Sequence, residues 1–91
     1  MFDLPNIYKI EGRVPQKIRV KAIEEFIIYQ NSNNKTVLAE IQKNKEFIAD
    51  LYQMTDEYFA RDFQGRMFLV GEINNDGDLA LIDYFKLVRS E

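Results

Sequence analysis

The sequence predicts an α+β domain: a small antiparallel sheet packed against one long helix, with a β-hairpin at the C-terminal end. Three observations predict this class. Residues 17–22 alternate between charged and apolar, residues 44–63 carry an apolar stripe with helical spacing, and two β-favouring segments flank a polar connection near residue 76. At 91 residues and 46% hydrophobic content, the chain has room for one core, so residues 1–91 are expected to form one domain.

The first half of the chain is predicted to be strand. Lys17, Arg19 and Lys21 alternate with three apolar residues, which is the period of a half-buried strand. The β-favouring run at residues 26–29 continues the pattern, and residues 7–12 are interpreted as a short edge strand. The polar cluster Asn31–Asn34 predicts a turn.

A long helix is predicted from Asn44 to Phe63. An apolar stripe recurs there at the spacing of one helix face: Ile48, Leu51, Tyr52, Thr55, Phe59 and Phe63. Glu46, Asp50 and Glu57 fall on the opposite, solvent-facing side. Asn44 is a suitable cap for the start, and Gly65 suits the left-handed residue after the end.

A β-hairpin is predicted after the helix, from residues 67–70 and 79–85, with a turn at residues 74–78. The same order permits one alternative, a winged-helix arrangement. It would place helices at about residues 16–30, 36–43 and 45–62 and make residues 74–78 the wing. Its recognition helix would turn Glu46, Asp50 and Glu57 toward phosphates, which is electrostatically unfavourable for DNA binding.

Two missing residue types limit the chemistry. Without His or Cys, the chain cannot form a Cys/His zinc site, a Ser-His relay or a thiolate nucleophile. Its glycines are isolated, so no phosphate-binding loop is present. Two carboxylate pairs, Asp76 with Asp78 and Asp56 with Glu57, are expected to be solvated and therefore not tuned for acid–base catalysis. We predict a protein that is not an enzyme and needs no cofactor.

Residues 72–83 carry a motif of oxygen ligands and glycine. Glu72, Asn74, Asp76, Gly77, Leu79 and Asp83 stand at positions one, three, five, six, eight and twelve of a loop that partly resembles those of EF-hand and dockerin calcium sites. The resemblance implies a calcium-binding loop. It departs from the pattern at its first position and through three apolar residues at 80–82. A hairpin turn needs the same residue types, so we predict a turn without metal and keep calcium as the less favoured alternative.

The start of the chain has no signal peptide, no segment approaches the about 20 apolar residues of a membrane span, and cysteine is absent. These features predict a cytoplasmic protein that does not bind membranes.

Charge segregation suggests how the protein acts. Lys17, Arg19 and Lys21 form a basic strand face, whereas Glu46, Asp50 and Glu57 form an acidic helix face. Two surfaces of opposite sign favour docking onto another protein, as in a small adaptor, regulator or inhibitor, and self-association would use the same surfaces. The alternative is nucleic-acid binding through Lys17, Arg19 and Lys21. An isoelectric point near 5.0 and the lack of interleaved aromatic residues disfavour it.

Overall fold

The computed structural model describes residues 6–29 and 37–90, which form nine β-strands and no helix. The described part of the chain therefore has no helix that could cross a membrane. The predicted turn at Asn31–Asn34 lies outside the described residues. The strands are β1 (Ile7–Tyr8), β2 (Lys17–Ala22), β3 (Phe26–Tyr29), β4 (Val37–Ile41), β5 (Glu46–Tyr52), β6 (Glu57–Arg61), β7 (Met67–Ile73), β8 (Leu79–Leu81) and β9 (Phe85–Ser90).

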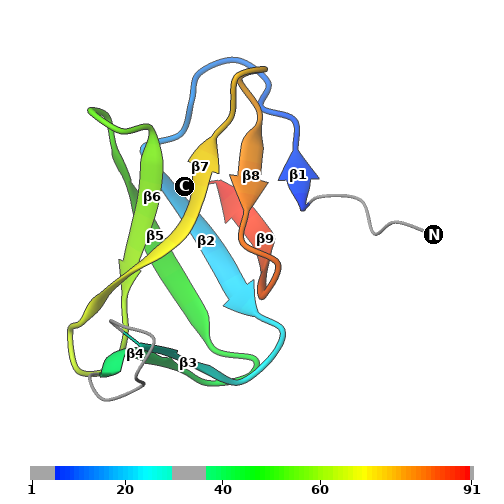
Figure 1. Cartoon of the computed structure of the whole chain (residues 1–91). Helices are drawn as coiled ribbons and strands as arrows, with labels where there is room; N and C mark the ends of the chain where they lie inside the picture. Colours follow the sequence, from blue (N-terminus) through cyan, green and yellow to red (C-terminus); the bar gives the residue numbers. More distant parts are fainter. Residues whose placement is uncertain (1–5, 30–36, 91) are drawn as a thin grey trace.

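Seven strands form one antiparallel sheet in the order β1-β8-β7-β6-β5-β2-β9. Strands β5 to β8 pair with their neighbours in sequence, and β9 returns to pair with β2. The two edge strands approach each other, since the Leu87 amide donates to the Tyr8 hydroxyl at 3.2 Å and the Asn6 side chain donates to the Phe85 carbonyl. The sheet is thus a nearly closed barrel (Figure 1).

Strands β3 and β4 form a separate two-stranded hairpin, inserted between β2 and β5. It lies across one end of the barrel, at the bottom of Figure 1. Hydrogen bonds between the backbones of Ala22, Asn44 and Lys45 join the chain where it leaves β2 to the chain where it enters β5. The hairpin therefore projects from two adjacent barrel strands.

The core fills the barrel with side chains that alternate along each strand. The inward residues of β2 are Ile18, Val20 and Ala22, which confirms the predicted period-two strand. The other buried apolar residues are Ala39, Ile41, Phe47, Ala49, Tyr58, Ala60, Phe68, Val70, Leu79, Leu81 and Phe85. The edge-on contact of Phe47 with Phe68, at 5.1 Å between ring centroids, is one of several aromatic contacts that anchor this core.

The predicted helix at 44–63, and with it the α+β class, is wrong. Residues 46–52 and 57–61 are antiparallel strands joined by a tight turn, in which Asp56 adopts a left-handed φ of 56°. The inward side chains are Phe47, Ala49, Tyr58 and Ala60, which alternate with period two.

The predicted apolar stripe belongs mostly to the outside of the barrel. Ile48 and Phe59 are half-exposed, Tyr52 is 43% exposed and Phe63 is 59% exposed. Their spacings of four residues fit a helix, but they are also multiples of two and fit a strand. The seven-residue interval from Tyr52 to Phe59 spans the turn, so two outward strand faces imitate one helical face.

The winged-helix alternative is also wrong, because residues 17–22 and 26–29 are strands as first predicted. The predicted C-terminal hairpin is confirmed as β7 and β8, although Phe85 already begins β9. Gly71 is needed where these strands meet, since a Cβ atom there would lie 2.6 Å from the Ala80 carbonyl oxygen. The predicted edge strand is reduced to Ile7–Tyr8, which pairs with β8.

Asp62 is a buried carboxylate that connects the hairpin with the barrel. It accepts hydrogen bonds from the backbone amides of Gln64 and Arg66, from the Arg66 side chain at 2.8 Å, and from the Glu40 amide in β4 at 3.1 Å. Burial alone would raise its pKa, but together these hydrogen bonds and the guanidinium hold the pKa of the carboxyl below its usual value. Asp62 therefore stays charged while it fixes β4 to the turn after β6.

Candidate functional site

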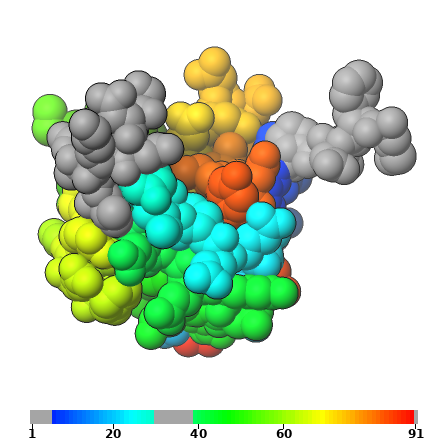
Figure 2. All heavy atoms as spheres, turned by 60° about the horizontal axis from the view of Figure 1, so that its bottom comes forward, coloured from blue at the N-terminus to red at the C-terminus, as the bar shows by residue number. Residues whose placement is uncertain are grey.

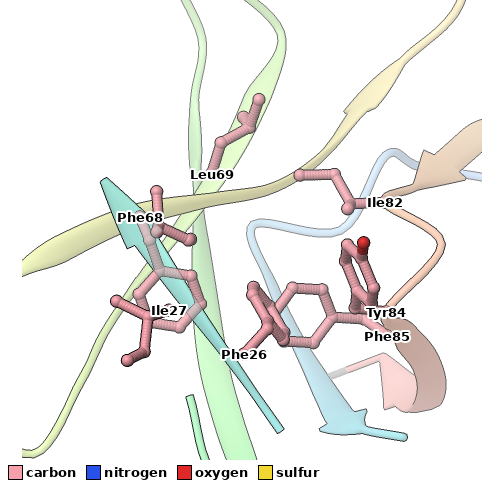
Figure 3. A pocket seen from close by; sticks show the side chains of 8 residues that line it. Phe26, Ile27, Phe68, Leu69, Ile82, Tyr84 and Phe85 are labelled. Carbon is pink, nitrogen blue, oxygen red and sulfur yellow. The ribbon is translucent and has the colours of Figure 1, made fainter. Parts of the chain in front are cut away.

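An apolar groove of about 380 Å³ lies where the β3–β4 hairpin meets the barrel (Figure 3). Its volume falls within the range of ligand pockets, and its lining is mainly apolar. The groove is lined by Phe26, Ile27, Ile28, Phe68, Leu69, Ile82, Tyr84 and Phe85.

Aromatic contacts hold the two walls of the groove together. The Phe26 ring of β3 stacks on Tyr84 with 4.5 Å between centroids and meets Phe85 edge-on at 5.7 Å. The Ile23 amide donates to the Tyr84 carbonyl at 2.8 Å, which joins the chain before β3 to the turn before β9. The buried rings of Phe68 and Phe85 stack on each other and provide a floor from the barrel core.

Exposed apolar side chains gather around this groove. Ile27 and Tyr84 line it and are 47% and 42% exposed. Ile23 and Tyr29, which are 42% and 38% exposed, lie within three residues of groove residues in the chain. Figure 2 shows β3 and the turn before β9, in cyan and orange, side by side on this end of the molecule. Several exposed apolar residues close to a groove are characteristic of an interaction site, whereas a single exposed apolar residue is not.

Three acidic residues flank the groove. Glu24 and Glu25 precede Phe26, and Asp83 precedes Tyr84, so all three acids lie within two residues of the Phe26–Tyr84 stack. All three residues are exposed, and none of them forms an ion pair in the described part of the chain. We call Glu24, Glu25 and Asp83 the acidic rim.

The sequence-predicted binding residues lie elsewhere. Lys17, Arg19 and Lys21 point outward from β2, and Glu46 and Asp50 point outward from the adjacent strand β5. These five residues form what we call the charged face. Glu57 lies one strand further on, in β6, where it is paired with Tyr52 and Glu72 in the strand registers.

The predicted separation into a basic strand face and an acidic helix face is wrong, because these residues share one sheet. Lys17 donates to the Asp50 carboxylate, and Arg19 lies 3.4 Å from Glu46. Lys21 is opposite Glu46 in the register of β2 and β5. The basic stripe is thus largely neutralised by its neighbours, which leaves little positive charge for phosphates.

A smaller hollow of about 200 Å³ lies beside the charged face, on the outside of β5, β6 and β7. Its apolar side chains include Tyr52 and Phe59, whose rings meet edge-on at 4.9 Å, and Met67, whose sulfur lies 3.1 Å from the Tyr52 hydroxyl. Asp50 and Arg61 also line it, so it is more polar than the groove.

The segment that resembles a calcium loop is built as a hairpin turn. The side-chain oxygen of Asn74 accepts hydrogen bonds from the backbone amides of Asp76 and Asp78, each at 3.0 Å. Gly77 has a left-handed φ of 81°. Leu79 points into the barrel core. Within residues 6–29 and 37–90, no group of three acidic residues is arranged to hold a metal ion.

The groove residues were missed by sequence reasoning, which treated residues 26–29 only as a strand. One signal was present: the run Phe-Ile-Ile-Tyr contains no alternating polar residues, so this strand has no polar, solvent-facing side. The contribution of Tyr84 has no local signal, because it depends on a strand about 60 residues earlier in the chain folding against it.

No protein-family model, curated protein or solved structure matches this chain. The geometry of the groove and the charged face is therefore the basis for any functional conclusion.

Proposed function

We propose that this chain is a non-enzymatic protein-binding module, and that its apolar groove receives side chains of a partner protein. The observation that carries the proposal is the concentration of exposed apolar residues around a pre-formed, aromatic-lined groove. Aromatic residues on a rigid scaffold bury a large area at low entropic cost, and for this reason they dominate protein interfaces.

The charged face has a different role in this proposal. Its ion pairs are exposed and already satisfied within the chain, so they add little free energy to a complex. The five residues of the charged face were predicted, together with Glu57, to bind the partner. In this proposal the charged face affects association rate more than affinity. A cytoplasmic location remains part of this proposal.

Site-specific photo-crosslinking in the native host tests the proposal. A photoreactive amino acid at position 27 lies on the groove, whereas the same amino acid at position 54 lies on the fully exposed Met54 in the turn after β5. We expect position 27 to give a discrete crosslinked protein that survives nuclease treatment, and position 54 to give none.

The variant Ile27→Glu provides the matching loss of function. Ile27 is 47% exposed, so the substitution leaves the fold intact while placing a carboxylate in the groove. With the photoreactive group placed at position 29, Ile27→Glu is expected to abolish the crosslinked product. Equal crosslinking from positions 27 and 54, or a product that persists with Ile27→Glu, would contradict the proposal. Crosslinks only to nucleic acid would favour the alternative function.

A further inference from the structure

The groove is bordered by an unpaired strand edge. Strand β3 pairs with β4 on one side, and in the described part of the chain no strand pairs with its other side. Successive side chains of a strand point to opposite faces, yet Phe26, Ile27 and Ile28 all line the groove. The groove therefore runs along the edge of β3, where backbone amides and carbonyls are available, and not only along one of its faces.

The opposite wall of the groove also includes a strand segment, in β7, that lies beyond the pairing with β8. Phe68 and Leu69 of β7 are consecutive and both line the groove, while β8 pairs with β7 only from Gly71 to Ile73. An extended segment bound here would meet backbone hydrogen-bonding groups of β3 and apolar side chains from both walls. This combination is the requirement for recognition by strand addition.

The acidic rim restricts which segment fits. Glu24, Glu25 and Asp83 are exposed, form no ion pair with any described residue and lie within two residues of the Phe26–Tyr84 stack. A bound segment that carries Lys or Arg near this stack therefore gains favourable Coulomb energy. A second copy that paired its β3 edge in parallel would bring two acidic rims together, which is unfavourable. Antiparallel pairing of two copies is an outcome that the test below distinguishes.

From these observations we infer that the groove binds an extended, basic segment of a partner protein, which adds to the free edge of β3 and places alternate apolar side chains in the groove. This inference rests on the proposed function and specifies the partner. It accounts together for the unpaired edge, the aromatic lining and the unpaired carboxylates.

Peptide selection against the full chain tests the inference. Random peptides displayed on phage are selected on immobilised protein, and the best binders are synthesised and titrated calorimetrically. We expect enrichment of Lys or Arg beside alternating apolar residues. Reversing the rim with Glu24→Lys, Glu25→Lys and Asp83→Lys is expected to weaken the best peptide about tenfold or more.

A matched triple variant, Glu11→Lys, Glu72→Lys and Asp76→Lys, changes the net charge equally with exposed acids outside the groove lining. It should alter affinity by less than about twofold. Backbone N-methylation of the peptide tests strand addition, because only alternate amides of an added strand face β3. Methylation at one residue should cost about tenfold in affinity, and at the next residue less than about twofold. Thermal melts of both triple variants confirm that they fold.

The inference fails if no peptide is selected, if selected peptides lack basic residues, if both triple variants weaken binding equally, or if N-methylation has no alternating effect. It also fails if sedimentation shows a dimer that Ile27→Glu dissociates, because a second copy would then occupy the groove. In each of these cases, a crosslink from position 27, together with a crosslink from position 29 that Ile27→Glu abolishes, would still support the proposed function. The two ideas can therefore fail separately.

Discussion

The charged face and the groove differ in how their carboxylates are partnered. On β2 and β5, Asp50 and Glu46 meet basic side chains of the adjacent strand. At the groove, Glu24, Glu25 and Asp83 have no such partner in the described residues. Asp62 has more partners than any carboxylate of the charged face, since it is buried and accepts four hydrogen bonds. Charge that is satisfied internally stabilises the fold, whereas unsatisfied charge is available for binding.

The largest effect is expected at the most fully partnered carboxylate. Asp62→Ala should reduce the free energy of unfolding by about 3–5 kcal/mol, because it removes the 2.8 Å ion pair of the Arg66 guanidinium and the acceptor of the Glu40 amide. Urea unfolding measures the loss. The exposed acid Asp83 is the control, and Asp83→Ala should change stability by less than about 0.5 kcal/mol. Equal losses for the two variants would contradict the comparison.

The same carboxylate predicts an acid-sensitive component of stability. Because the folded-state pKa of Asp62 lies below its unfolded value of about 3.9, its contribution is complete above that value and is lost as the pH falls through the folded pKa. Urea unfolding at a series of pH values from neutral to about 2 measures this loss. Asp62→Asn should lack this component, so the curves for the two proteins should converge at low pH.

Tyr58 and Tyr84 allow the same comparison between a partnered and an exposed polar group to be made for hydroxyls. Burial, assisted by the Asp56 carboxylate, raises the pKa of Tyr58 to about 12, and its hydroxyl donates to the Pro15 carbonyl at 2.6 Å. Tyr58→Phe should cost about 0.5–1.5 kcal/mol, whereas Tyr84→Phe in the exposed groove should cost less than about 0.5 kcal/mol.

The raised pKa of Tyr58 also gives the sign of the alkaline effect. Its contribution is complete below the unfolded pKa of about 10 and is lost as the pH rises toward about 12. Denaturation curves at alkaline pH should show this loss in the native protein and not in Tyr58→Phe. A similar alkaline loss in Tyr58→Phe would assign it to another group.

A smaller effect is expected on the charged face. A double-mutant cycle on Lys17 and Asp50 should give a coupling energy of about 0.2–1 kcal/mol, since both side chains are more than half exposed. Raising the salt concentration should reduce this coupling. A coupling above about 2 kcal/mol would mean that the charged face contributes to folding as strongly as a buried site.

The smallest effect on stability is expected at the acidic rim. Glu25→Gln removes one of the two consecutive acids Glu24 and Glu25, so it should change the free energy of unfolding by less than about 0.5 kcal/mol, in the stabilising direction. Thermal denaturation compares it with the native protein. A clear destabilisation would show that Glu25 has a structural partner after all.

Part of this fold was predictable from local pattern. The alternation over Lys17–Ala22 and the apolar segments around residues 74–78 are explicit in the sequence, and both became the strands they predicted. The helix failed for a specific reason: the outward residues Ile48, Tyr52, Phe59 and Phe63 are separated by four, seven and four residues. A spacing of four satisfies both a strand and a helix, so only the turn at Asp56 distinguishes them.

The site was less predictable than the fold. The ion pairs of Lys17 with Asp50 and Arg19 with Glu46 required knowing that β2 and β5 are neighbours, and an intervening hairpin separates these strands in the sequence. The groove likewise depends on contact between Phe26 and Tyr84. Local periodicity carries no information on such long-range contacts, and sheet pairing determines them.

The edge of β3 that pairs with no described strand has a consequence for the solubility of the protein. A strand of sequence Phe-Ile-Ile-Tyr with an open edge is a template for fibril growth. Glu24 and Glu25, directly before it, are positioned as gatekeepers that keep such edges from stacking in register. Glu24 and Glu25 contribute little to the stability of the fold but would protect the solubility of the protein. A variant without these two acids should therefore fold equally well but precipitate sooner.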